Sequence, residues 1–453
     1  MGTWPLPFES AMKRLLGLES AALLNALNEP PPVSIRLNPL KPISNDGDVV
    51  PWCREGSYLH QRPVFTLDPA FHQGCYYVQE ASSMFIGEIL RQTIPADRPI
   101  RALDCCAAPG GKSTHLLDGL HPDSLLVCNE VIRSRVPVLT QNLVRWGRSN
   151  AVVTSSDPDR YAGLTGCFDL ILVDAPCSGE GMFRKDPAAA CQWSPEHVSL
   201  CRSRQQRILQ AVWPALRENG ILIYSTCTWN EEEDEENLNA FARECDAESV
   251  RLNTDASWGV MEVEANGTYG YKFFPHRLKG EGFFAGVLRK KSATAEPGPK
   301  RDRPDRKPAE PADLKNLLMQ PDRFEFRQDR EVWYAELGSH SSFLRLLDQS
   351  VERVRSGLRI GEWKHGKFIP DHDLSMSVDL NHQSLPKLEL DHDDAVRFLR
   401  KETVSAPGSG MHLVRHRHHG LGWANLLPGR MNNLLPTNWR IRMNADQGAP
   451  GPF

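Results

Sequence analysis

The stretch Asp104-Cys105-Cys106-Ala107-Ala108-Pro109-Gly110-Gly111-Lys112-Ser113-Thr114 directly follows a short apolar run at residues 100–103. Small residues after such a run predict a tight turn from a β-strand into a helix, the place where open α/β sheets bind their ligands. The paired glycines let backbone amides approach a ligand, and the amino end of a helix favours a carboxylate such as that of methionine. The spacing matches neither G-x-G-x-x-G nor a P-loop, which disfavours phosphate binding.

Short apolar runs alternate with amphipathic stretches as far as residue 289. The second of two long helical patterns has Ser194 as a candidate N-cap and Pro195 at its first helical position. This alternation predicts the α/β class, with an open sheet and helical crossovers. The predicted strands cover residues 100–103, 125–128, 151–153, 168–173, 221–224, 269–274 and 282–288, and the predicted helices cover residues 131–146 and 196–217.

Acidic residues stand at the ends of the later apolar runs. Glu130 follows the second run, Asp157 the third and Asp174 the fourth. A carboxylate after the second strand of such a sheet can accept hydrogen bonds from both hydroxyls of a ribose. Together with the glycine turn, these acids predict a cofactor that contains both a nucleoside and a methionine, which is S-adenosylmethionine.

Two cysteines follow the ends of two neighbouring predicted strands. Asp174-Ala175-Pro176-Cys177-Ser178-Gly179-Glu180-Gly181 comes after the fourth run, and Ser225-Thr226-Cys227-Thr228-Trp229 comes after the fifth. Both thiols are therefore expected to face the crevice at the carboxyl ends of the strands. A thiolate that adds to carbon 6 of a pyrimidine makes carbon 5 nucleophilic enough to accept a methyl group. Asp174, adjacent to the thiols, is expected to hydrogen-bond the edge of the pyrimidine.

Cys227 is predicted to lie immediately before a helix, whose amino end would lower the pKa of the thiol. The acidic run at residues 231–236 is expected to lie in the first turn of that helix and to remain solvated. The eleven cysteines form no C-x-x-C pair, which indicates neither a disulfide framework nor a zinc ribbon. The cluster His416-Arg417-His418-His419 lacks a cysteine or acid at ligand spacing, so no metal is expected.

The composition of the 453-residue chain is that of an ordinary folded protein, with 40% hydrophobic and 24% charged residues. The net charge of −4 disfavours a uniformly basic nucleic-acid binder but allows a local basic face. The sequence contains neither a secretory signal pattern nor an apolar run of about 18 residues. We therefore expect a cytoplasmic monomer that makes no membrane contact.

The motifs resemble those of the Nol/Nop/Sun family of RNA 5-methylcytosine methyltransferases. The shared motifs are D-x-C-A-A-P-G-G-K at the glycine turn, Asp-Ala-Pro-Cys-Ser-Gly and Ser-Thr-Cys, and all three are intact. The resemblance implies a Rossmann-like class I S-adenosylmethionine-dependent methyltransferase in which Cys227 is the nucleophile and Cys177 assists product release. The implied cofactor-binding residues are Cys106, Ala107, Ala108, Pro109, Gly110, Gly111, Lys112, Glu130, Asp157 and Asp174.

Within this family, residues 274–284 and 432–442 resemble the bacterial RsmF type, which has a PUA-like RNA-binding end. The implied substrate is a cytosine in 16S rRNA of the small ribosomal subunit. Basic residues near the C-terminus suit contact with phosphates. The RNA contacts expected along the whole chain are Arg36, Asn38, Lys112, Arg440 and Arg442.

The chain is too long for a single core, and its composition changes along its length. Residues 290–312 combine proline, glycine and charge without an apolar period, as a solvated linker does. The predicted parts are an N-terminal RNA-contacting extension at 1–60, the methyltransferase domain at 61–289, the linker at 290–312, a first C-terminal accessory domain at 313–385 and a PUA-like RNA-binding domain at 386–453.

Four other functions stay open at this point. The same chemistry can act on cytosine in tRNA, and the same fold can serve a DNA cytosine methyltransferase or a methyltransferase for amino or hydroxyl groups. A methyltransferase domain can also lose turnover and serve as a ribosome-assembly factor that only binds RNA. The second strand-end cysteine, Cys227, distinguishes the chain from a DNA enzyme, which is expected to use its Pro-Cys cysteine.

Overall fold

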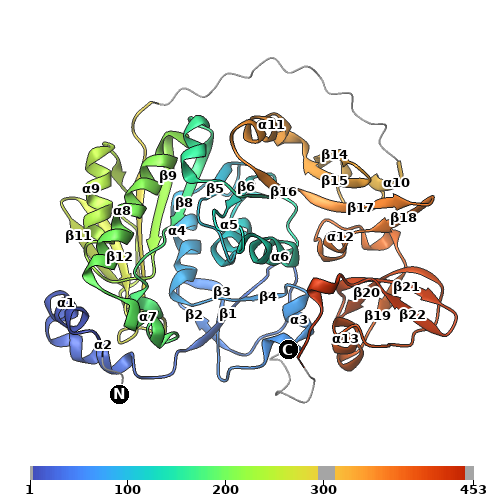
Figure 1. Cartoon of the computed structure of the whole chain (residues 1–453), viewed down its shortest axis with the longest axis horizontal. Helices are drawn as coiled ribbons and strands as arrows, with labels where there is room; N and C mark the ends of the chain where they lie inside the picture. Colours follow the sequence, from blue (N-terminus) through green and yellow to red (C-terminus); the bar gives the residue numbers. More distant parts are fainter. Residues whose placement is uncertain (1–3, 294–311, 444–453) are drawn as a thin grey trace.

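The computed structural model describes residues 4–293 and 312–443, so most of the predicted linker lies outside the described residues. At its centre is a sheet whose middle five strands are parallel, in the order β9-β8-β5-β6-β7. The chain runs from β5 outward to β6 and β7, then returns to form β8 and β9 on the other side of β5 (Figure 1). The strands are β5 (Arg101–Asp104), β6 (Leu125–Asn129), β7 (Ala151–Thr154), β8 (Phe168–Asp174) and β9 (Leu216–Thr226).

Helices cover both faces of this sheet, as the predicted crossovers require. On one face, α4 (Phe85–Thr93), α5 (Gly111–Gly119) and α6 (Val136–Trp146) pack against alternate residues of the strands. On the opposite face, the strands pack against α8 (Pro195–Val212) and α9 (Glu235–Glu244). The remaining helix of this region is α7 (Pro187–Gln192).

The start of α8 follows its capping residues. Ser194 accepts a hydrogen bond from the backbone N–H of His197 at 3.2 Å, and Pro195 is the first helical residue, as predicted. By contrast, α6 begins five residues later than the predicted helix, because Glu130 accepts a hydrogen bond from the backbone of Ile132 at 2.7 Å and holds a turn there.

Antiparallel strands extend the central sheet at both edges. Beyond β9 lie β13 (Phe283–Arg289), β12 (Thr268–Phe273) and β11 (Met261–Ala265), and β10 (Glu248–Ser249) pairs with β13. The opposite edge is completed by β16 (Arg353–Ser356), which comes from the C-terminal region and pairs antiparallel with β7. A segment about 200 residues further along the chain therefore covers the free edge of the catalytic sheet.

The N-terminal region forms a helical pair and a separate sheet. The sheet order is β2-β3-β1-β4, and β4 pairs with β1, so this sheet continues beyond residue 60, where sequence predicts the boundary. The elements of the N-terminal region are α1 (Leu6–Leu16), α2 (Ser20–Ala26), β1 (Val33–Leu37), β2 (Asp48–Val50), β3 (Cys53–Leu59), α3 (Pro69–His72) and β4 (Tyr76–Val78).

The C-terminal region contains two further four-stranded sheets, drawn in orange and red in Figure 1. The first includes β14 (Phe324–Asp329), β15 (Val332–Leu337), β17 (Leu358–Lys364) and β18 (Lys367–Pro370), with α10 (Ala312–Lys315), α11 (Ser341–Ser350) and α12 (His372–Met376). The second includes β19 (Lys387–Glu389), β20 (Gly410–His416), β21 (His419–Leu427) and β22 (Arg430–Asn433), with α13 (His392–Leu399). No helix among the described residues has the length and apolarity needed to cross a membrane.

Candidate active site

The glycine turn joins β5 to α5 beside the point where the strand order reverses. Gly110 has a φ of 111°, in the region that favours glycine, and α5 begins at Gly111. Asp104 ends β5 and is fully buried, with Oδ2 accepting a hydrogen bond from Ser113 Oγ at 2.6 Å. Burial raises the pKa of Asp104 to about 7. Its Oδ1 has no hydrogen-bond partner among the described residues, so a buried acceptor is left for a ligand.

The three predicted acids lie at the carboxyl ends of their strands, in different surroundings. Glu130 is 3% exposed and lies 3.3 Å from the guanidinium of Arg135. Asp157 is on the surface, where pairing with Arg207 at 3.1 Å outweighs a partial desolvation and lowers its pKa. Asp174 accepts hydrogen bonds from Lys112 Nζ at 2.8 Å and from Ser225 Oγ at 2.9 Å.

A cavity of about 560 Å³ brings most of these groups together. The residues that line it include Glu130, Ile132, Asp174, Cys177 and Cys227. A smaller hollow of about 170 Å³ adjoins it through Cys106, Ala108 and Asp174, and is also lined by Asp104 and Lys112. Tyr77 and Gln79 of the N-terminal region contribute to this hollow as well.

The two predicted thiols meet in the larger cavity. Their sulfur atoms lie 3.1 Å apart, and the backbone N–H of Cys227 donates to Cys177 Sγ at 3.3 Å. The hydrogen bond to Cys227, together with burial, raises the pKa of Cys177 well above its usual value. The raised pKa favours the protonated form of Cys177, and either sulfur can be the donor in the contact between them.

Cys227 does not lie at the amino end of a helix, contrary to prediction. The next helix, α9, begins at Glu235, so its dipole does not act on this thiol at close range. A different positive group is near. Although burial opposes the charge of Lys112, attraction to Asp174 and to Cys227 raises its pKa, so this side chain is a cation beside the thiol pair.

The acidic run is also placed differently from the prediction. Glu233 and Asp234 are fully buried and Glu235 is 9% exposed, whereas Glu231, Glu232 and Glu236 are exposed as expected. The buried acids face hydrogen-bond donors and the buried ammonium of Lys272, which lies 2.7 Å from Glu235. These partners come from residues far along the chain, so the local charge pattern does not indicate them.

Two of the predicted RNA contacts lie in the protein interior. Arg36 is fully buried, pairs with Asp118, donates to Thr114 Oγ1 at 2.6 Å and stacks on the ring of Trp146. Asn38 is 2% exposed, and its side-chain NH₂ donates hydrogen bonds to the backbone carbonyls of Gly74 and Trp146. The prediction of RNA contact is wrong for these two residues, because their side chains instead attach the N-terminal sheet to the catalytic domain.

The other predicted contacts are accessible. Arg440 and Arg442 are exposed near the end of the described chain, beyond β22. Lys112 is partly exposed at the edge of the smaller hollow. These three side chains remain predicted RNA contacts.

The residues around the turn fit S-adenosylmethionine. A buried carboxylate after β6 suits a ribose, the glycine turn allows close approach of backbone amides, and the unpartnered Oδ1 of Asp104 suits an ammonium group. Sequence reasoning did not assign Asp104, although its position at the end of β5 matches that of the three acids it did assign. An open parallel sheet with this site at the reversal of its strand order, together with the fit to S-adenosylmethionine, is the arrangement expected of a class I S-adenosylmethionine-dependent methyltransferase.

Comparisons with known proteins narrow this class. Residues 94–289 match the model of "16S rRNA methyltransferase RsmB/F", residues 4–81 match the RsmF N-terminal domain, and residues 385–441 match the RsmF PUA domain. The "Ribosomal RNA small subunit methyltransferase F" of Citrobacter koseri is 31% identical, covering 85% of this chain and 83% of the relative. The corresponding protein of Escherichia coli K12 is 30% identical, with 85% and 83% covered.

Two solved structures from Pyrococcus horikoshii share the fold. A methyltransferase homolog is 27% identical with a TM-score of 0.54, covering 63% of this chain and 95% of that one. NSun6 is 21% identical with a TM-score of 0.54, covering 64% and 98%. The chain belongs to the RsmF-type 16S rRNA methyltransferases of the RsmB/F family. This membership confirms the expected class, fold and cofactor, and the activity is S-adenosylmethionine-dependent methylation of cytosine in 16S rRNA.

Proposed function

We propose that Cys227 is the nucleophile of this cytosine-5 methylation and that Cys177 resolves the covalent intermediate. The observation that supports the proposal most strongly is the 3.1 Å approach of the two sulfur atoms, in a cavity also lined by Glu130 and Asp174. A methyltransferase acting on an exocyclic nitrogen or oxygen needs no thiol, whereas carbon 5 needs covalent activation of the ring.

The reaction begins when a cytosine that is neither base-paired nor stacked on its neighbours enters the cavity. The Cys227 thiolate adds to carbon 6, and the electron pair of the ring double bond becomes available at carbon 5. Asp174 is placed beside the thiols to hydrogen-bond the cytosine edge, and Lys112 supplies a positive charge nearby. S-adenosylmethionine, when bound, supplies the methyl group that carbon 5 receives.

Release requires that carbon 5 lose its proton and that the bond between sulfur and carbon 6 break. The electron pair of the lost C–H bond restores the ring double bond, and the sulfur of Cys227 leaves with the pair of the S–C bond. Because Cys177 lies in hydrogen-bond contact with Cys227, its sulfur can accept the proton of carbon 5 while its own proton passes to the departing sulfur, so that loss of the C–H proton and cleavage of the S–C bond occur together. The net transfer is one proton from carbon 5 to Cys227.

Purified protein incubated with labelled S-adenosylmethionine tests the substrate. We expect label in 16S rRNA and, by bisulfite sequencing, protection of a defined cytosine. Naked 16S rRNA and assembled small subunits are compared in parallel, because the fold does not distinguish these two forms. Label in tRNA alone would support the alternative substrate, and tight RNA binding without any transfer would support a silent assembly factor.

Glu130 is proposed to hold the ribose of the cofactor. Glu130→Gln retains the size of the side chain and an oxygen that can accept from Ile132, but replaces one acceptor with a donor. We expect S-adenosylhomocysteine to bind about tenfold more weakly, as measured by calorimetry, because a hydrogen bond to a charged group is lost. The exposed Glu231 provides a control, since Glu231→Gln should leave the affinity unchanged. If Glu130→Gln binds S-adenosylhomocysteine within about twofold of the wild-type affinity, Glu130 does not hold the ribose.

Arg440 and Arg442 are proposed to contact phosphates of the RNA through the C-terminal region. Both side chains are exposed in the part matched by, or directly following, the RsmF PUA domain. Removing both charges should weaken RNA binding and lower the slope of log affinity against log salt by about two. Arg243→Ala, which removes an exposed charge on α9, should change neither quantity. An unchanged salt slope in the double variant would contradict phosphate contact.

We further propose that the protein acts as a monomer in the bacterial cytoplasm. All eleven cysteines are free thiols, which agrees with a reducing compartment. Both cysteines of the site lie within one chain, so no second copy is required to complete the proposed chemistry.

A further inference from the structure

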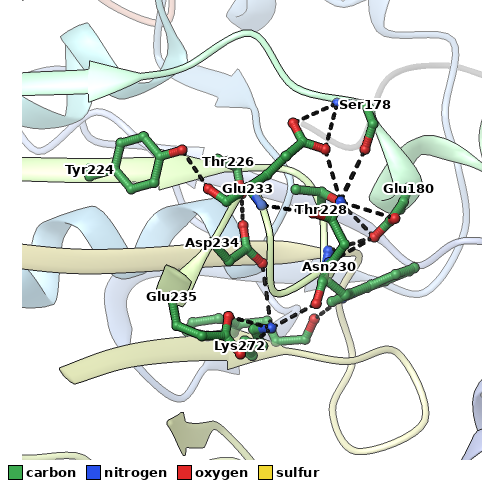
Figure 2. A network of polar contacts seen from close by, with 12 residues as sticks. Ser178, Glu180, Tyr224, Thr226, Thr228, Asn230, Glu233, Asp234, Glu235 and Lys272 are labelled. Carbon is green, nitrogen blue, oxygen red and sulfur yellow. Dashed lines mark hydrogen bonds and ion pairs between the residues drawn. The ribbon is translucent and has the colours of Figure 1, made fainter. Parts of the chain in front are cut away.

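The loops that present the two thiols are joined by a buried polar network, shown in Figure 2. One loop follows β8 and contains Cys177, and the other follows β9 and contains Cys227. A single backbone bond connects them directly, from the N–H of Gly181 to the carbonyl of Cys227 at 2.9 Å. The backbone N–H of Cys227 also donates to Cys177 Sγ at 3.3 Å, and Ser178 Oγ lies 3.3 Å from Thr228 Oγ1 and accepts from Asn230 Nδ2 at 3.3 Å. Two glutamates, Glu180 and Glu233, both fully buried, add further connections between the loops.

Glu180 belongs to the Cys177 loop, yet its carboxylate binds the Cys227 loop. Its Oε2 accepts hydrogen bonds from the backbone N–H groups of Trp229 at 2.8 Å and Asn230 at 3.1 Å. The same oxygen accepts from Thr228 Oγ1 at 2.6 Å. Glu180 therefore fixes the three residues that directly follow Cys227.

Glu233 makes the reverse connection. It lies downstream of Cys227, and its Oε2 accepts a hydrogen bond from the backbone N–H of Ser178, the residue after Cys177, at 3.0 Å. Gln205 Nε2 donates to the same oxygen at 2.7 Å, and Asn230 Nδ2 donates to Oε1 at 2.8 Å. Each glutamate thus holds the loop that presents the other cysteine.

The protein maintains two carboxylates here at a cost. Neither Glu180 nor Glu233 has an ion-pair partner in the described part of the chain, and the one buried ammonium nearby, Lys272, lies with Asp234 and Glu235. The negative charge of the two glutamates is met by N–H and O–H groups alone. A buried carboxylate without a neighbouring cation is unfavourable unless hydrogen-bond donors surround it. The positions of the two carboxylates therefore depend on the positions of the loops that supply these donors.

We propose that Glu180 and Glu233 are positioning residues that divide the two-step reaction between them. Glu180 holds Cys227 for formation of the covalent bond, and Glu233 holds Cys177 for release of the product. The inference rests on the proposed roles of the two cysteines. It adds that the two steps respond separately to changes in two side chains that touch neither RNA nor cofactor.

The test uses Glu180→Gln and Glu233→Gln in single-turnover reactions with the RNA substrate and S-adenosylmethionine. An amide must turn its NH₂ toward an existing donor, so each variant loses at least one hydrogen bond to its loop. Samples quenched over time and separated under denaturing conditions give the rates of adduct formation and adduct decay. We expect Glu180→Gln to slow formation about tenfold while decay changes little, and Glu233→Gln to slow decay about tenfold while formation changes little.

Glu88→Gln is the matched control, because Glu88 is a buried glutamate on α4 whose partners include Arg91 and Gln92 and neither cysteine loop. Both of its rates should equal those of wild type. If a glutamine variant does not fold, Thr228→Val and Gln205→Met remove one donor from Glu180 and Glu233 respectively. These milder variants should show the same division of effects at about threefold.

Equal slowing of both steps in the two variants, or slowing that only follows the loss of folded protein, would overturn the proposal and leave the glutamates a purely structural role. Failure of the underlying chemistry has a different signature. If Cys227→Ala still forms an adduct or methylates RNA, the roles of the cysteines are wrong irrespective of what the glutamate variants do.

Discussion

Cys227→Ala is expected to reduce methyl transfer to RNA by about three orders of magnitude or more, the scale of loss when a covalent nucleophile is removed. Without the thiolate, carbon 5 of the cytosine lacks the electron density to accept a methyl group. Binding of cofactor and RNA should persist, because the cavity is otherwise intact. Incorporation of labelled methyl groups into 16S rRNA measures the effect, and binding of S-adenosylhomocysteine establishes that the variant is folded.

Cys245→Ala provides the matched control for Cys227→Ala. Cys245 is also a free, half-buried thiol, but it follows α9 and does not line the cavity. Its replacement should leave the transfer rate within about twofold of wild type. Substantial methylation by Cys227→Ala, with none by Cys177→Ala, would instead assign the nucleophile to Cys177, the arrangement expected of a DNA-type enzyme.

Cys177→Ala should have the second-largest effect and a different appearance. The covalent bond from Cys227 to carbon 6 should still form, but its cleavage lacks the neighbouring thiol that donates and accepts the protons. We expect turnover to stop after about one cycle, with a stable protein–RNA adduct visible by denaturing electrophoresis.

A second variant tests whether the protein–RNA adduct of Cys177→Ala is bonded through Cys227. The double variant Cys177→Ala with Cys227→Ala should form no adduct, because the attacking sulfur is absent. Multiple turnover by Cys177→Ala at a rate near that of wild type would contradict a role in release. The same outcome would leave the role of Cys227 untouched.

The framework of the catalytic domain is predictable because its signals are local. Apolar runs, the glycine turn and the Ser194 cap each fix an element within a few residues, and the parallel order then brings the strand-end cysteines together. The start of α6 was not predictable from periodicity, since the side chain of Glu130 holds the preceding turn. The predicted place of the cofactor site rests on position along the sheet rather than on tertiary detail.

Two of the errors, at Arg36 and Glu233, share one physical origin, which is burial of a charged side chain against partners far along the chain. Arg36 is read as a surface contact because its partner, Asp118, lies 82 residues away and is invisible to a local pattern. Glu233 is read as a solvated acid for the same reason, since its donors Ser178 and Gln205 precede it by 55 and 28 residues. A charged residue is normally exposed, so burial is predicted only when the partner is known.

The pairing of β16 with β7 has a consequence for synthesis on the ribosome. The strand β7 leaves the ribosome about 200 residues before β16, which at cellular rates of elongation corresponds to roughly 10 to 40 s. During this interval the nascent catalytic sheet has an unpaired edge that can recruit strands from other chains. A strand of the first C-terminal region therefore closes the catalytic sheet, and a nascent chain interrupted before β16 would be a target for chaperones or proteases.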